Sequence, residues 1–185
     1  MKTAITLLTL SRIIIAPLLF ILIIFFQFFG WAFILFLITA FTDYLDGFLA
    51  RKYNFESVIG EILDPIADKI IIIFLLFALS IHLESFFMAG MGATMVARDI
   101  WVNGVREYNA RFSQSDKTKV TFLAKIKTSI QMLTVSAYLF ALFIENLFLL
   151  FISDFLLFLS VIISLLTGFK YTVNSMQSYK DLVIK

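Results

Sequence analysis

Four aspartates stand close together in segments of the chain that are otherwise apolar enough to lie in a lipid bilayer. Residues 43–51 read DYLDGFLAR, and residues 60–69 read GEILDPIADK. An ionised aspartate at the centre of a membrane helix costs about 2.5 kcal/mol or more. The cluster of Asp43, Asp46, Asp64 and Asp68 therefore needs a compensating charge, for which a bound cation is the first candidate.

The composition indicates an all-α, polytopic membrane protein. Hydrophobic residues make up 61% of the 185 residues, more than is usual in a soluble domain. The chain has 23 Phe but only two Pro and seven Gly, which favours long helices among lipid over short strands with frequent turns. We expect a single domain over residues 1–185.

Hydropathy divides the chain into six expected transmembrane helices. A tight turn at residues 27–31 would join the first two, and a polar tail would follow at residues 179–185. The first apolar stretch has no small-residue cleavage site after it and is expected to be a retained span. The expected spans are residues 5–29, 31–51, 58–81, 86–110, 120–143 and 147–178.

The basic residues predict the orientation of the bundle. The turns near Gln27, His82 and Glu145 contain no Lys or Arg, and all 15 Lys and Arg fall on or near the opposite end. Cytoplasmic loops carry the excess of Lys and Arg, so that end and both termini are expected to be cytoplasmic. The acids would lie in the cytoplasmic half, and the site would face the cytoplasm of an inner membrane.

The spacing of the acids suits a metal centre. Residues three or four apart share a helix face, so each of the two helices presents its own pair of acids. Two antiparallel helices joined by a short link can bring four carboxylates to one point. Without cysteine and with a single histidine, the ligands must be oxygens, which suit Mg²⁺ or Mn²⁺. Two such ions about 3.5–4 Å apart form a clamp for displacement at phosphorus.

Small residues share these faces. Gly47, Ala50 and Gly60 would leave room for a flat group between the helices, and Arg51 could neutralise a phosphate beside it. Two other readings stay open. The acids could form structural ion pairs with Arg51, Lys52 or Lys69, or they could belong to a transporter or channel that binds a cation. Neither reading requires small residues beside the acids.

The eight positions of this pattern resemble a known signature. Asp43-x-x-Asp46-Gly47-x-x-Ala50-Arg51, eight residues, then Gly60-x-x-x-Asp64-x-x-x-Asp68 is similar at every position to that of the CDP-alcohol phosphotransferase family. The resemblance implies a six-span fold, a homodimer and two Mg²⁺ or Mn²⁺ ions at the cytoplasmic surface. It makes Asp43, Asp46, Asp64 and Asp68 metal ligands, Asp68 also the general base, and Asp46, Gly47, Ala50, Arg51 and Gly60 the CDP- and cytidine-binding residues.

Other stretches resemble one branch of the family, the phosphatidylglycerophosphate synthases. Arg12 and Pro17 stand in a similar first span, and residues 63–69 are similar to the third, whereas Asp99 and Ala124 depart from that branch. The branch implies transfer of the phosphatidyl group of CDP-diacylglycerol to glycerol 3-phosphate. Serine, inositol phosphate or phosphatidylglycerol are alternative acceptors. The cations predicted to bind the acceptor phosphate are Arg98, Arg106, Lys125 and Lys127.

These four cations also have a simpler reading, as flanking charge that only sets the topology. One acid stays outside the pattern. Asp154 lies inside the last span with no evident partner in the sequence, and we expect it to reach the outer face of the membrane.

Overall fold

The computed structural model describes residues 2–53, 58–111 and 122–183, with side chains described at 10–43, 45, 63–64, 66–109 and 128–176. Within these ranges the chain forms six α-helices and no strand, which confirms the all-α prediction. The helices are α1 (Lys2–Ile24), α2 (Phe29–Tyr53), α3 (Val58–His82), α4 (Phe86–Arg111), α5 (Phe122–Phe143) and α6 (Leu147–Val183).

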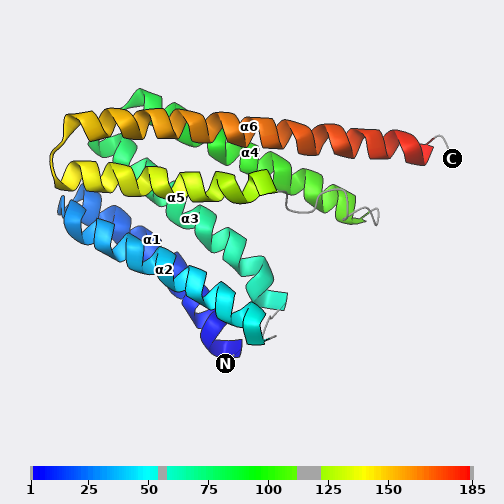
Figure 1. Ribbon diagram of the computed structural model, residues 1–185, viewed down its shortest axis with the longest axis horizontal. Coiled ribbons are helices and arrows are strands. Elements are labelled where there is room, and N and C mark those ends of the chain that lie inside the picture. Colours follow the sequence, from blue (N-terminus) through cyan, green and yellow to red (C-terminus); the bar gives the residue numbers. More distant parts are fainter. Residues whose placement is uncertain (1, 54–57, 112–121, 184–185) are drawn as a thin grey trace.

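The helices form a bundle that is closed at one end and spread at the other (Figure 1). The turns α1–α2, α3–α4 and α5–α6 lie at the closed end, while the N- and C-termini lie toward the other. From the closed end, α1 and α2 diverge from α4, α5 and α6. Helix α3 contacts both groups, because it packs on α1 and also on α4 and α5.

The core lies toward the closed end and is built from apolar side chains of all six helices. Leu19 of α1, Phe36 of α2 and Leu75 of α3 are fully or almost fully buried, as are Met88, Leu139 and Leu157 of the other three. Large side chains also cover the outside: Phe86 is 94% exposed and Phe169 is 72% exposed. Such extensive apolar exposure suits a surface in contact with lipid rather than water.

The three turns share one backbone feature. Gln27, Glu84 and Glu145 each have positive φ, between 48° and 53°. At the second and third turns the amide that follows this residue donates to a carbonyl five residues earlier, as in a Schellman cap: Ser85 to Ser80, and Asn146 to Ala141. Ser85 and Asn146 then cap the next helices by accepting the amide protons of Met88 and Leu149.

The first turn corrects a prediction. The sequence places it at residues 27–31, but α1 ends at Ile24 and α2 already begins at Phe29, so Gly30 is helical. A Cβ on Gly30 would lie 2.7 Å from the ring of Phe143 on α5. Gly30 therefore serves a close approach of two helices, whereas sequence reasoning took it for a turn residue.

Helix α6 differs from two further predictions. It continues to Val183 and includes most of the predicted polar tail, because polarity alone does not end a helix and residues 169–185 contain neither Gly nor Pro. Asp154 is not without a partner, since the Tyr138 hydroxyl of α5 donates to its Oδ1 at 2.5 Å. This bond joins two helices, so the expected reach to the outer face is not needed to explain Asp154.

Among the residues whose side chains the structure describes, one helix has a segment long and apolar enough to span a membrane. Leu147–Met176 is long and apolar enough to cross a bilayer, while the apolar stretches Leu10–Ile24, Phe29–Asp43 and Thr128–Phe143 are shorter. The six-span topology with both termini on one side stays a prediction.

Candidate functional site

Three of the four predicted metal-binding acids meet at one point, and the group that they surround is Arg12 of α1. Its Nη1 atom lies 2.5 Å from Oδ1 of Asp43 and 2.6 Å from Oδ1 of Asp68. Its Nη2 atom lies 3.0 Å from Oδ1 of Asp64. We call these four residues the acid cluster. The Arg12 side chain is 5% exposed, whereas the acids are 25–40% exposed.

The acid cluster is assembled through α1. Asp43 belongs to α2, and Asp64 and Asp68 belong to α3, but α2 and α3 do not pack against each other within the described residues. Helix α1 packs against both. The sequence predicts that the two acid-bearing helices bring the carboxylates to one point, and in the structure three of them meet there, on an arginine of a third helix.

The structure does not describe the side chains of several predicted site residues. The side chains of Asp46, Gly47, Ala50, Arg51 and Gly60 fall outside the described residues, although their backbones belong to α2 and α3. The same holds for Lys125 and Lys127 of α5. Their predicted roles stay predictions.

The donor set suits a divalent ion, since three carboxylates from two helices already gather around a positive charge. Their Oδ1 atoms face the guanidinium, and among the described residues no three acidic or histidine side chains are spaced to hold a metal ion. The cluster thus has ligands of the right chemistry, arranged here around an organic cation.

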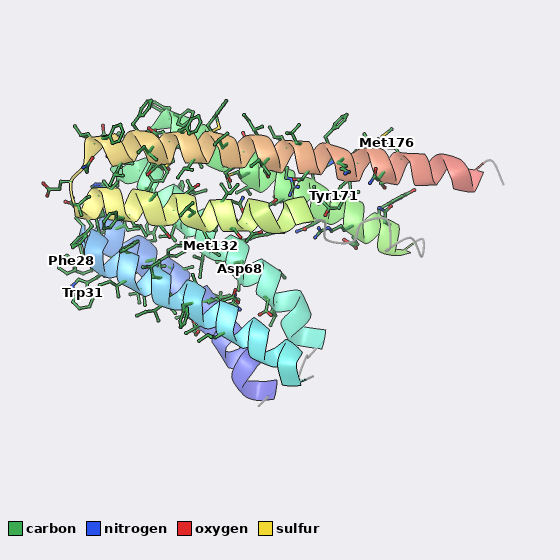
Figure 2. All side chains as sticks on the ribbon, in the orientation of Figure 1. Phe28, Trp31, Asp68, Met132, Tyr171 and Met176 are labelled. Carbon is green, nitrogen blue, oxygen red and sulfur yellow. The ribbon has the colours of Figure 1, made fainter. Side chains whose placement is uncertain are left out.

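A second group of charges follows directly along α3. Lys69 donates from Nζ to Oδ1 of Asn103 on α4 at 3.0 Å. It also lies close enough to Asp99, Arg106 and Arg98 of α4 to interact with their charges. We call Lys69, Arg98 and Arg106 the basic cluster. Because Asp68 and Lys69 are neighbours in sequence, the acid cluster and the basic cluster adjoin on α3. Figure 2 shows where Asp68 lies along this helix.

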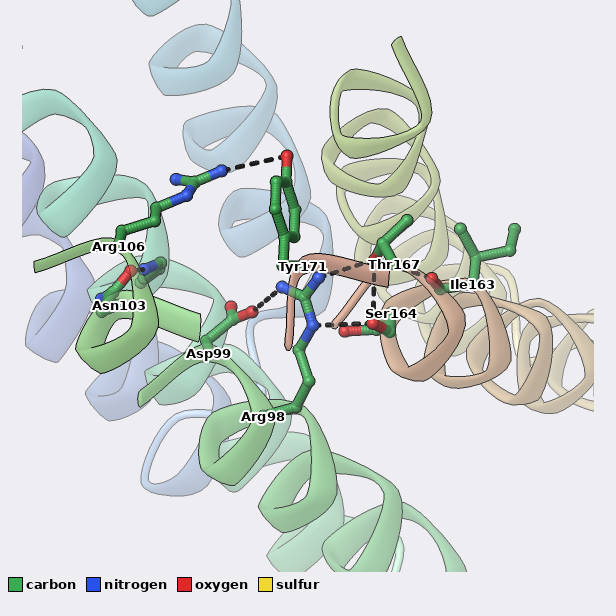
Figure 3. A network of polar contacts seen from close by, with 9 residues as sticks. Arg98, Asp99, Asn103, Arg106, Ile163, Ser164, Thr167 and Tyr171 are labelled. Carbon is green, nitrogen blue, oxygen red and sulfur yellow. Dashed lines mark hydrogen bonds and ion pairs between the residues drawn. The ribbon is translucent and has the colours of Figure 1, made fainter. Parts of the chain in front are cut away.

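Arg98 is fully engaged within the protein (Figure 3). Nε donates to the Ser164 carbonyl at 2.7 Å, Nη2 to Thr167 Oγ1 at 2.6 Å, and Nη1 to Asp99 Oδ1 at 2.8 Å. Its side chain is 9% exposed. These bonds tie α4 to α6, so Arg98 has a structural function in this arrangement, and its predicted contact with phosphate stays a prediction.

Arg106 is held much more loosely. Its Nη2 atom donates to the Tyr171 hydroxyl at 3.3 Å, and the guanidinium lies 5.0 Å from the centre of that ring (Figure 3). Its Nε atom is buried and finds no acceptor in the described part of the chain. A buried donor without a partner costs about 1–3 kcal/mol. An anion that reaches Arg106 would satisfy this donor.

Sequence reasoning missed Arg12 as a site residue and assigned no site residue to the last span. Arg12 could have been singled out, because an arginine in an apolar span needs an acidic partner as much as the aspartates need a cation. The partners on α6 carry a weaker signal. Ser160, Ser164, Gly168 and Tyr171 recur three or four residues apart on one helix face, with Thr167 beside them.

The model of the family described as "CDP-alcohol phosphatidyltransferase" matches residues 3–168. A protein of Wigglesworthia glossinidia brevipalpis is 37% identical over 164 residues, covering 85% of this chain and 90% of that protein. A protein of Salmonella choleraesuis is 36% identical over 135 residues, covering 71% and 73%. A protein of Shigella flexneri serotype 5b is 31% identical over 170 residues, covering 90% and 91%. Each is named CDP-diacylglycerol--glycerol-3-phosphate 3-phosphatidyltransferase.

Gly168 of α6 offers a test of how tightly Arg98 of α4 packs against α6. A Cβ at this position would lie 2.9 Å from Nε and 3.2 Å from Cγ of Arg98, whose bonds to α6 leave it little freedom. Gly168→Ala should lower the free energy of unfolding by about 1–3 kcal/mol, as overpacking does. Thermal unfolding in detergent measures this. Gly104→Ala on α4 is the control, because a Cβ there meets nothing within 4 Å. Equal melting temperatures for the two variants would contradict the tight packing of Arg98.

Proposed function

The chain belongs to the CDP-alcohol phosphatidyltransferase family, and we propose on this basis that it transfers the phosphatidyl group of CDP-diacylglycerol to glycerol 3-phosphate. The products are phosphatidylglycerophosphate and CMP, so the enzyme serves phospholipid biosynthesis. The names of its relatives support both substrates.

The observation that carries this proposal is the junction of the acid cluster and the basic cluster on α3. A transferase of this kind must hold a lipid diphosphate and a small phosphate dianion side by side. The acids, with cations bound between them, suit the first task, and arginine and lysine side chains suit the second. Asp68 and Lys69 stand next to each other at the boundary between the two clusters.

For the donor, we propose that Asp43, Asp46, Asp64 and Asp68 hold two Mg²⁺ or Mn²⁺ ions. When bound, such ions neutralise the diphosphate and stabilise the charge that develops on the leaving group. Arg51, Gly47, Ala50 and Gly60 would bind the CDP moiety. Asp43, Asp64 and Asp68 already contact one cationic group, the guanidinium of Arg12, which supports their assignment as a shared ligand set.

The reaction requires one proton transfer and one displacement. The free hydroxyl at the end of glycerol 3-phosphate attacks the phosphorus attached to diacylglycerol, and its proton goes to a carboxylate oxygen of Asp68. The bond from that phosphorus to the CMP oxygen breaks, and CMP leaves with the electron pair. Asp68 suits the part of the base because it borders the basic cluster that would hold the acceptor.

For the acceptor, we propose Arg106 as the principal phosphate ligand among the described residues. Its unpaired Nε donor and its long bond to Tyr171 leave it able to turn toward an anion. Lys69 of the basic cluster lies nearby, and Lys125 and Lys127 would join from α5. Arg98 would act mainly by keeping α4 on α6.

We further propose an inner-membrane protein with six spans, both termini in the cytoplasm and the site facing the cytoplasm. The gathering of the 15 Lys and Arg away from the three turns of the closed end supports this orientation. A homodimer, which the family resemblance implies, stays a prediction.

The activity has a direct assay. Purified protein in detergent micelles with CDP-diacylglycerol, glycerol 3-phosphate and Mg²⁺ or Mn²⁺ should release CMP, and excess EDTA should abolish the release. Asp68→Asn should retain donor binding but lose turnover by at least about 100-fold, since general-base catalysis contributes at least that much. Absence of CMP release under all these conditions would refute the transferase. Release with serine or inositol phosphate alone would reassign the acceptor, and release in EDTA would refute the metal requirement.

Arg106 should control the affinity for the acceptor. Arg106→Met removes a charge-assisted contact worth about 1.5–3 kcal/mol, so KM for glycerol 3-phosphate should rise roughly 10- to 100-fold. KM for CDP-diacylglycerol should stay the same. Arg98→Lys is the matched comparison, and it should lower the melting temperature more than it changes either KM. An unchanged acceptor KM in Arg106→Met would remove Arg106 from the acceptor site.

The absence of cysteine makes the orientation testable in an otherwise unchanged chain. In intact cells a membrane-impermeant maleimide should label Asn146→Cys in the α5–α6 turn. It should not label Ser115→Cys, between α4 and α5, until the cells are opened. The reverse pattern would place the site on the outer face.

A further inference from the structure

Arg12 is the residue of the acid cluster that the proposed reaction leaves without a task. It stands in an apolar helix, is 4% exposed overall, and contacts three acids from two other helices. Arg12 carries one positive charge, and the residues that it contacts are three carboxylates. Arg12 and divalent ions must therefore share, or compete for, the same acids.

The contacts favour competition. All three acids direct Oδ1 at Arg12, and two of these oxygens meet on a single nitrogen, Nη1. A divalent ion bound by these aspartates would place its own charge where the guanidinium now lies, and two cations repel each other at such distances. A divalent ion that takes the Oδ1 atoms of these acids would therefore have to displace Arg12 from them.

We propose that Arg12 is the internal counter-cation of the metal-free acid cluster, and that it gives up the carboxylates when divalent ions bind. The inference rests on the proposed metal site. In the metal-free protein Arg12 supplies positive charge that would otherwise be missing among acids in a low-dielectric bundle. The same pairing weakens the apparent affinity for the metal, because each ion must displace a bound group.

The residue type and its position fit this role. A guanidinium presents its two terminal nitrogens in a fixed fork, which lets Nη1 serve Asp43 and Asp68 while Nη2 serves Asp64. Helix α1 is anchored four residues further on by Ala16 and then by Leu19, both fully buried. The backbone of Arg12 is thereby held beside α2 and α3, and its long side chain reaches acids of both helices.

The competing explanation is a permanent ion pair that holds α1 against α2 and α3 with or without metal. The two explanations differ in how the loss of Arg12 depends on metal. A permanent pair stabilises both states equally, whereas a counter-cation stabilises only the metal-free state and opposes metal binding.

The test uses the full chain in detergent, with thermal unfolding followed in EDTA and in Mn²⁺, and with Mn²⁺ binding measured by electron paramagnetic resonance. Arg12→Met should lower the melting temperature in EDTA by at least about 5 °C, and saturating Mn²⁺ should restore it to within about 2 °C of wild type. Its Mn²⁺ affinity should be roughly tenfold higher than that of wild type. An equal loss of melting temperature in both conditions, or Mn²⁺ binding no tighter than in wild type, would overturn the proposal.

Arg98→Met is the matched control, because it also removes a buried arginine, but one that belongs to α4 and bonds to α6 instead of to the acids. Its melting temperature should fall by the same amount in EDTA and in Mn²⁺, and its Mn²⁺ affinity should not change. If Arg12→Met fails to fold, Arg12→Lys keeps the charge without the fork, and it should bind Mn²⁺ about threefold more tightly than wild type. Unchanged affinity in Arg12→Lys would then overturn the proposal.

The variant Asp64→Asn distinguishes an error in the proposed metal site from an error in the proposed role of Arg12. If wild type binds no Mn²⁺, or if Asp64→Asn binds it equally well, the metal site is wrong and the inference falls with it. If wild type binds Mn²⁺ through Asp64 but Arg12→Met behaves like wild type, the metal site stands and only the role of Arg12 is refuted.

Discussion

The ion pairs of Arg12 with Asp43, Asp64 and Asp68 are the interaction on which the arrangement of this protein depends. Charges in an apolar bundle are tolerated only when they are paired, because neither lipid nor packed side chains replace the water that they lose. Here one buried guanidinium meets acids from both neighbouring helices. The first helix is thus part of the site, and within the described residues it links α2 to α3.

Helix α3 joins the two parts of the bundle. It packs on α1 on one side and on α4 and α5 on the other. Its consecutive residues contact different helices: Asp68 pairs with Arg12 of α1, and Lys69 bonds to Asn103 of α4. In the proposed reaction the donor and the acceptor are both anions, so the acids would hold cations for the first and the basic side chains would bind the second. Two neighbouring residues on one helix provide both kinds of group.

Helix α6 supports the acceptor side indirectly. Its carbonyl and hydroxyl groups at Ser164 and Thr167 hold Arg98, and its Tyr171 ring and hydroxyl hold Arg106. Gly168 leaves the space that Arg98 occupies. The polar residues of this last helix gave only a weak signal in the sequence, because each is common in membrane helices and their partners, the arginines of α4, are distant in the chain.

The sequence by itself determined the all-α class, four of the six helices to within two residues at each end, and the pattern of acids and small residues that identifies the family. These features are local, since hydropathy and helical spacing act within one segment. Tertiary structure decided which helices meet. It placed α1 between the acid-bearing helices, used Gly30 for a helix contact instead of a turn, and gave Asp154 a partner in Tyr138. Such pairings depend on how distant faces fit together, and no single segment carries that information.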